Sequence, residues 1–175
     1  MRAKDGNKSD VKPPFVLRSL EMYQSLAWQA LDFVEKAILE CLEIEHLSQG
    51  GAQNGRLIVT YNEFEKAGIR RSKIKRALDR LQALGFIEYS TFGYDEACGK
   101  RHANNYTLTY VNSRHETRKG AYHPAPRPSN AWRKLNSEAG VKRALARAEK
   151  KRAARRRTQL AVSEEVLNLE PAAAY

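Results

Sequence analysis

Basic and hydroxyl side chains recur at helical spacing over residues 71–84, a pattern that could bind nucleic acid. At 100° per residue, one side of this segment is apolar and the opposite side is mostly cationic. The apolar side comprises Ile74, Ala77, Leu78, Leu81 and Leu84. The cationic side, its edge and the adjoining helix start comprise Arg70, Arg71, Ser72, Lys73, Lys75, Arg76 and Arg80. Because Arg pairs bidentately with guanine and Ser donates to phosphate or base, this face suits the major groove of duplex DNA; an ordinary solvated amphipathic helix is the alternative.

Other cations could bind phosphate. Arg70 and Arg71 oppose the helix dipole at the start of the segment, a placement that a bound phosphate would offset. Lys100 and Arg101 lie in a polar loop that could reach the DNA backbone or a minor groove; a soluble loop is the alternative. A C-terminal run would add sequence-independent binding by counterion release, unless it is an RNA-binding arm or a solvated tail. Its members are Lys150, Lys151, Arg152, Arg155, Arg156 and Arg157.

Few residues could support catalysis. Cys98 and His102 could supply two metal ligands, but no second close pair completes a tetrahedral set, and His115 and His123 are distant. The chain has no phosphate-binding loop and no nucleophile-elbow motif. We therefore expect no catalytic residue, no metal, no cofactor and no enzymatic activity.

The charge of the chain is concentrated in its C-terminal third. The 175 residues carry a net charge of +11, of which residues 1–12 contribute +2, residues 13–111 zero, residues 112–160 +12 and the last fifteen residues −3. Such an excess attracts polyanions, so DNA is the expected partner and RNA remains an alternative. No apolar stretch is long enough to span a membrane, and the two cysteines, Cys41 and Cys98, form no disulfide framework. These features predict a cytoplasmic, nucleoid-associated protein.

Periodicity predicts the elements that carry these residues. We expect an extended segment over 15–20, and then a helix over 31–47 with Glu35, Glu40, Glu43 and Glu45 on the side away from its apolar face. A strand over 57–59 precedes Thr60 and Glu63, which have capping-box spacing and start a helix over 61–67. Gly68 ends that helix, and Gly85 ends the helix over 71–84. Alternating residues in 86–92 and 105–110 predict an antiparallel hairpin around a polar loop.

This order predicts an α+β fold, the winged helix-turn-helix, in which 71–84 is the recognition helix and the hairpin is the wing. The expected organisation is a flexible N-terminus (1–14), the winged-helix domain (15–111), a Pro-containing linker (112–135) and a basic tail with an acidic end (136–175). The tail has too few large apolar residues to pack on a core, so we expect it to be disordered or only conditionally helical.

Three runs carry a family resemblance: Asn54–Tyr61, Gly68-Ile69 and Ala83–Glu88. Over residues 54–110 the chain resembles uncharacterised bacterial winged helix-turn-helix DNA-binding proteins, which are often carried on plasmids and genomic islands. The resemblance implies DNA binding and a mobile-element context. It does not separate repressors, activators and replication initiators, which share this junction of recognition helix and wing.

The expected function is sequence-specific binding of double-stranded DNA, as in a transcriptional regulator. One alternative is a replication or partition factor of a mobile element. Another is an RNA-binding or adaptor protein that uses the basic tail. A homodimer through the helix over 31–47 or through the N-terminal segment is also possible.

Overall fold

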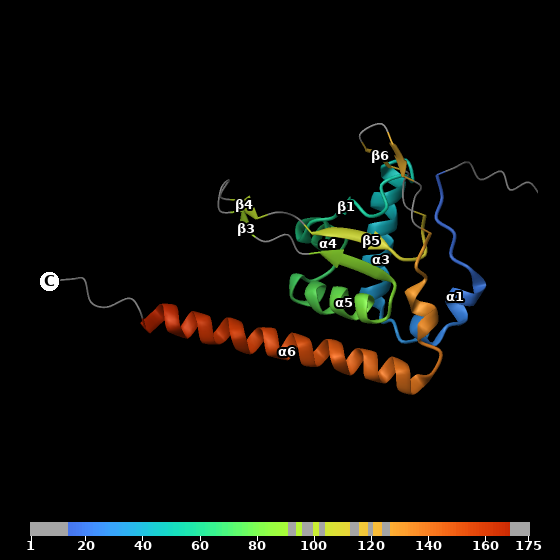
Figure 1. Cartoon of the computed structure of the whole chain (residues 1–175). Coiled ribbons are helices and arrows are strands. Elements are labelled where there is room, and N and C mark those ends of the chain that lie inside the picture. Colours follow the sequence, from blue (N-terminus) through green and yellow to red (C-terminus); the bar gives the residue numbers. More distant parts are fainter. Residues whose placement is uncertain are drawn as a thin grey trace, which may run out of the picture.

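The computed structural model describes residues 14–90, 94–95, 100–101, 104–112, 116–118, 121–123 and 127–168 (Figure 1). The helices are α1 (Leu20–Gln24), α2 (Leu26–Gln29), α3 (Phe33–Ser48), α4 (Tyr61–Lys66), α5 (Arg71–Ala83), the 3-10 helix η1 (Ala131–Lys134) and α6 (Glu138–Asn168). The strands are β1 (Leu57–Ile58), β2 (Ile87–Ser90), β3 (Tyr94–Asp95), β4 (Lys100–Arg101), β5 (Asn105–Leu108), β6 (Glu116–Arg118) and β7 (Ala121–His123). The fold is therefore α+β, as expected.

Local signals set the ends of α4 and α5. The Thr60 hydroxyl accepts a hydrogen bond from the Glu63 amide, and the Glu63 carboxylate accepts one from the Thr60 amide. Gly68 has φ +85°, the left-handed conformation that glycine adopts most readily. The predicted helices over 61–67 and 71–84, with a turn between them, are confirmed to within one residue. The short helices α1 and α2 were not predicted; each starts at a serine that caps it, Ser19 and Ser25.

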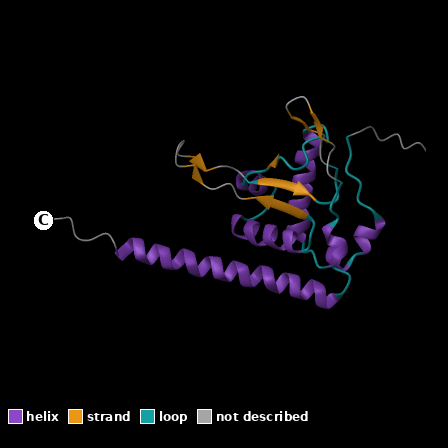
Figure 2. Cartoon of the chain, in the orientation of Figure 1, coloured by secondary structure: helices purple, strands orange, loops and turns teal. Residues whose placement is uncertain are grey.

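The main sheet has three antiparallel strands in the order β1-β5-β2. Ile87 pairs with Leu108 and Tyr89 with Tyr106, which confirms the predicted pairing of the two segments over their described residues. Between them, β3 pairs with β4 in a second, two-stranded sheet that alternation did not predict. Helices α3 and α5 pack against the main sheet (Figure 2). This arrangement is compatible with a winged helix.

Helix α3 buries charged residues as well as apolar ones. Its buried positions are Glu35, Ile38, Leu39, Leu42, Glu43 and His46. The expectation that Glu35 and Glu43 lie on a solvated acidic side is therefore wrong. The Glu43 carboxylate accepts hydrogen bonds from Arg18 Nε (2.8 Å) and from the Tyr110 hydroxyl. Burial and the neighbouring carboxylate raise the pKa of Tyr110 well above its usual range, so the phenol keeps the proton that it donates.

The core continues past residue 111, into the segment expected to be a linker. The Asn130 amide donates to the Thr109 carbonyl (2.9 Å), which brings the chain back to the sheet. Trp132 is 2% exposed and stacks on Phe86, with ring centroids 6.4 Å apart. The expectation that residues 112–135 are only a linker is wrong for this part of the segment. The sequence signal that was missed is a single large aromatic residue.

Helix α6 is also docked, because its first turns follow directly from this anchor. Val141 is 6% exposed, Leu145 packs against the core, and α6 contacts α5 and α2. These two apolar side chains and the alanines of α6 are enough to dock the helix, because small residues let two helices approach each other closely. The expectation that the tail cannot pack on the core is therefore wrong, and residues 138–168 form one helix.

We predict that Gly85→Ala destabilises the protein more than Gly68→Ala. Both glycines have positive φ, 78° and 85°, so each substitution should cost about 1–2 kcal/mol for the left-handed backbone. A Cβ at Gly68 would meet nothing within 4 Å, whereas one at Gly85 would lie 2.6 Å from the Trp132 backbone nitrogen. Gly85→Ala should therefore cost about 1–3 kcal/mol more, for overpacking. Urea unfolding of both variants measures the difference, and equal costs would mean that Trp132 does not pack there.

Candidate nucleic-acid interface

The first turn of α5 carries an exposed group of cations. Arg70, Arg71, Ser72 and Lys73 are all exposed. Arg71 is held by α4, since its Nη1 lies 2.6 Å from the Glu65 carboxylate and 2.9 Å from the Asn62 side-chain oxygen. Within the part of the chain that the structure describes, the side chains of Arg70, Ser72 and Lys73 have no ion-pair or hydrogen-bond partner. This turn therefore presents free donors and positive charge at a helix N-terminus.

Lys75 belongs to a different environment. Its Nζ lies 2.7 Å from Asp79 Oδ1 and also contacts the Tyr89 hydroxyl, which donates to the same Asp79 oxygen (2.6 Å). Burial and the Asp79 carboxylate raise the pKa of Tyr89 above its usual range, so the phenol stays protonated. Lys75 is half-buried and links α5 to β2 through this network.

Arg80 is part of the interior. Its guanidinium forms an ion pair with Glu35 and donates to the Ala30 carbonyl (3.2 Å). The side chains are 16% exposed for Arg80 and 1% exposed for Glu35. The expectation that Arg80 is exposed beside Arg76 is wrong. Its position on the helical wheel was read correctly, but α3 covers that edge of α5.

Helix α6 lies over the outward side of α5 (Figure 1). Arg76 Nε lies 2.9 Å from Glu149 Oε1, and Arg155 Nη1 lies 3.8 Å from Asp79 Oδ1. Between the helices is a groove of about 230 Å³, lined by Asp79, Gln82, Ala83, Ala144, Arg147, Ala148, Lys151 and Arg152. Arg76, which the sequence predicted to face a DNA groove, is therefore held by a carboxylate from α6.

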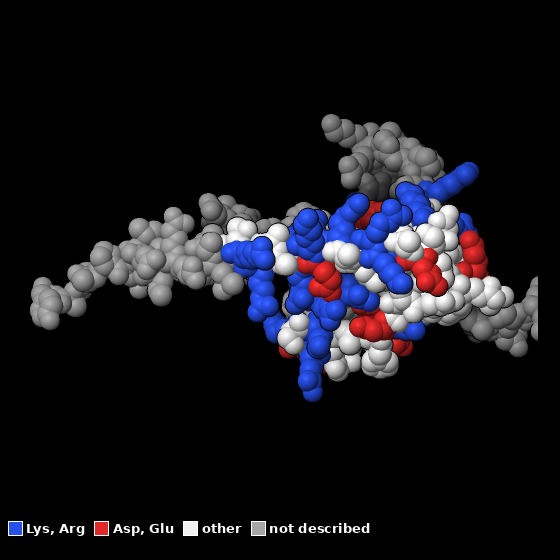
Figure 3. All heavy atoms as spheres, turned by 90° about the horizontal axis from the view of Figure 1, so that it is seen from below, with Lys and Arg blue, Asp and Glu red and all other residues white. Residues whose placement is uncertain are grey.

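The cations of α6 divide into two sets. Arg152 and Arg155 lie toward α5 and contact Glu149 (3.7 Å) and Asp79. Lys150, Arg156 and Arg157 are exposed and have no acidic partner among the described residues. Lys151 is also exposed and unpaired there, but it lines the groove against α5. Lys142, Arg143 and Arg147, which are not among the predicted sites, are exposed too, and Arg147 also lines the groove against α5. Figure 3 shows Lys and Arg side chains gathered over this face of the molecule, with Asp and Glu side chains at several places among them.

The remaining sequence-predicted positions are only partly described. Lys100 and Arg101 form β4 and pair with Asp95 and Tyr94 through the backbone, but their side chains lie outside the described residues. Cys98, His102 and His115 lie outside them altogether. Among the described residues, no group of His, Cys, Asp or Glu is arranged to hold a metal ion.

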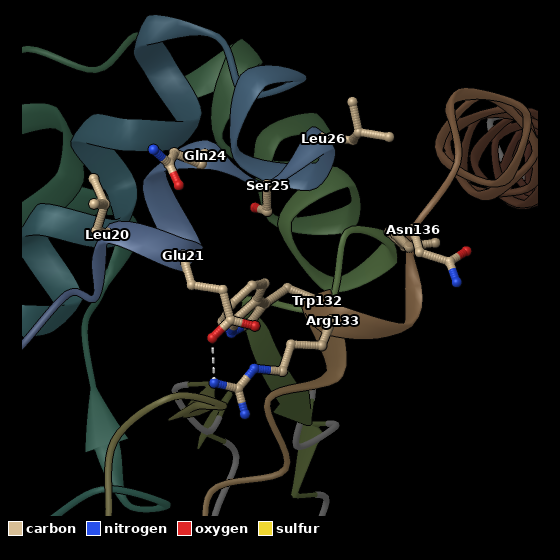
Figure 4. A pocket seen from close by; sticks show the side chains of 9 residues that line it. Leu20, Glu21, Gln24, Ser25, Leu26, Trp132, Arg133 and Asn136 are labelled. Atoms are coloured by element: carbon tan, nitrogen blue, oxygen red, sulfur yellow. Dashed lines mark hydrogen bonds and ion pairs between the residues drawn. The ribbon is translucent and has the colours of Figure 1, made fainter.

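A second groove, of about 460 Å³, separates α1 and α2 from η1 (Figure 4). Leu20, Ser25, Trp132 and Asn136 are among the residues that line it. Its two charged residues, Glu21 and Arg133, are paired with each other (2.5 Å). The groove thus offers no unpaired charge, and most of the exposed cations of the described chain lie elsewhere, at the start of α5 and along α6.

Comparison of the chain with known protein families, characterised proteins and solved structures found no match. No helix in the described part of the chain has both the length and the apolar character that a membrane span requires. A functional proposal must therefore rest on the residues themselves.

Proposed function

We propose that this protein binds double-stranded DNA sequence-specifically and acts as a transcriptional regulator rather than an enzyme. One observation carries the proposal: most of the exposed cations that have no acidic partner in the described chain lie at the start of α5 and along α6, whereas Arg18 and Arg80 are paired inside the fold. A folded chain gains nothing from crowding free cations on one face, and a polyanion offsets their repulsion.

The element order supports a winged helix as the scaffold. Helix α3, strand β1, helices α4 and α5 and strands β2 and β5 follow each other in the order of that fold. In a winged helix the second helix of the turn enters the major groove, and the hairpin beyond it carries the wing. The second helix corresponds to α5, and α6 covers its outward side beyond Arg76, so the start of α5 is the part that can enter a groove. Lys100 and Arg101 would then be the wing residues that reach the backbone.

The first turn of α5 is the proposed reading element. Arg70, Ser72 and Lys73 are free to donate, and the helix N-terminus adds its positive dipole toward a phosphate. Arg76 lies one turn further on, and its exposed ion pair with Glu149 is of a kind worth no more than about 1 kcal/mol. A guanine edge or a phosphate can therefore compete with Glu149 for the Arg76 guanidinium.

We predict that Lys73→Ala and Arg76→Ala each reduce discrimination between a selected duplex and a scrambled one. The expected loss is about 1–3 kcal/mol for a residue that contacts a base, with the melting temperature nearly unchanged. The duplex is first selected from a random library, and binding titrations on both duplexes give the discrimination.

Arg133→Ala is the matched control, because it removes one exposed Arg that is paired with Glu21, outside α5 and α6. It should leave discrimination intact. If both α5 variants keep full discrimination, α5 does not read DNA. If no duplex is ever enriched and single-stranded RNA binds better, the RNA-binding or adaptor alternative replaces this proposal.

A further inference from the structure

The two faces of α6 differ in what they contact. The inner face packs Val141 and Leu145 on the core, and Ala144 and Ala148 line the groove against α5. The same face carries Glu149, which is bonded to Arg76. Among the described residues, no hydrogen bond or ion pair joins the cations of the outer face to another helix or strand. It is this face that meets solvent or a partner.

Arg143, Lys150 and Arg157 form a row along the outer face, which we call the outer stripe. They are seven residues apart, and a seven-residue step turns an α-helix by only about 20° from two full turns. At 1.5 Å per residue, the row spans about 21 Å. Each side chain is exposed, and none has an acidic partner among the described residues. The one acid between residues 139 and 163, Glu149, faces α5.

We propose that the outer stripe binds the phosphate backbone of duplex DNA while the inner face of α6 stays packed on α5. The inference rests on the proposed function in taking duplex DNA as the ligand. It goes beyond the proposed function because it assigns the sequence-independent affinity for DNA to α6 and leaves discrimination between DNA sequences to α5. It also differs from a free tail wrapping around DNA, since the helix is already ordered and positioned by Trp132, Val141 and the groove against α5.

The chemistry of the stripe favours backbone contacts. Residues 138–158 contain no Asn or Gln, the side chains that read adenine, whereas Lys and Arg neutralise phosphates and release counterions. The large apolar residues of this stretch, Val141 and Leu145, pack on the core. The outer face of α6 therefore has no large apolar side chains of the kind that hold an amphipathic helix in a membrane surface.

Two double variants of the full chain test the inference. Lys150→Gln with Arg157→Gln removes two outer-face charges, and Arg152→Gln with Arg155→Gln removes two charges from the side toward α5. Both lower the net charge equally, and Gln preserves helix propensity. On a random-sequence duplex, the outer pair should flatten the slope of log K against log salt by about 1.8, since each phosphate contact contributes about 0.9. The inner pair should change it by less than half as much, and equal changes would overturn the inference.

A reversible cross-link tests whether α6 stays on α5. Ala83 and Ala148 line the same groove, so cysteines introduced at these positions, with Cys41 and Cys98 replaced by Ala, can be joined by a reducible bifunctional thiol reagent that spans the groove. The joined and reduced forms should bind the random duplex with the same affinity and salt slope. Loss of binding on joining would show that α6 must leave α5, and would overturn the inference.

The outcomes separate this inference from the proposed function. If the outer pair weakens binding to selected and scrambled duplexes by the same factor, the stripe binds backbone, whether or not α5 discriminates. If single-stranded RNA binds more tightly than the duplex and shows the same dependence on the outer pair, the stripe is an RNA surface and duplex DNA is the wrong ligand.

Discussion

Arg80→Ala is expected to lower the free energy of unfolding by about 3–5 kcal/mol, because it leaves the Glu35 carboxylate buried without a counter-charge. Glu35 is 0% exposed, and the described residues give its carboxylate one hydrogen-bond donor besides Arg80, the Asp32 amide at the start of α3. Water can reach the Glu35 carboxylate only if α3 and α5 move apart. Urea denaturation followed by circular dichroism gives the free energy directly.

Arg76→Ala is the matched control. It removes an Arg from the same helix and breaks another Arg–Glu ion pair, but the side chains there are 46% and 39% exposed. Exposed pairs contribute about 0–1 kcal/mol, so the two variants should differ by several-fold in their cost. Adding Glu35→Gln to an Arg80→Met variant should restore much of the stability, because Gln removes the buried charge and can still cap α3. Equal, small effects of Arg80→Ala and Arg76→Ala would show that Glu35 is solvated.

Trp132→Ala should also cost about 3–5 kcal/mol, as large-to-small substitutions of buried aromatic residues do. Its indole lies on Phe86, which in turn meets the edge of Trp28 at 5.7 Å. The cavity would therefore open beneath η1, where α6 begins. Denaturation should show the loss of stability, and limited proteolysis should show faster cleavage within α6.

Trp132→Phe separates packing from hydrogen bonding. The Trp132 Nε1 atom is buried without a hydrogen-bond partner, so Phe gives up no hydrogen bond and keeps a ring against Phe86. It should cost much less than Ala. If Trp132→Ala left the unfolding midpoint unchanged, residues 127–135 would be a linker after all.

Short-range signals let the sequence determine α4, α5 and the turn between them. The capping box joins Thr60 to Glu63, three residues away, and Gly68 supplies the left-handed residue that ends the helix. Neither signal depends on what packs nearby, which is why both predicted helices are confirmed to within one residue. The pairing of β2 with β5 followed from alternation, since residues on one face of a strand recur every second position.

The ion-pair partners of the α5 side chains could not be predicted in this way, because they come from distant parts of the chain. Arg80 meets Glu35 from 45 residues away, and Arg76 meets Glu149 from 73 residues away. A helical wheel gives the direction in which a side chain points but not the element that covers it. For the same reason Arg76 and Arg80, one turn apart and alike in sequence, have different environments.

The helix α6 shows the same limit. Its composition, rich in Lys, Arg and Ala, is typical of a free basic tail, and the energy of docking comes from a few residues at its start. Trp132 lies on Phe86, and Val141 and Leu145 follow it onto the core. The average composition of the segment does not reveal these three residues, because Lys, Arg and Ala outnumber them. The sequence by itself determined how many cations α6 carries, while only the tertiary structure decided which of them face α5 and which face outward, because that choice depends on where the buried anchor fixes the helix.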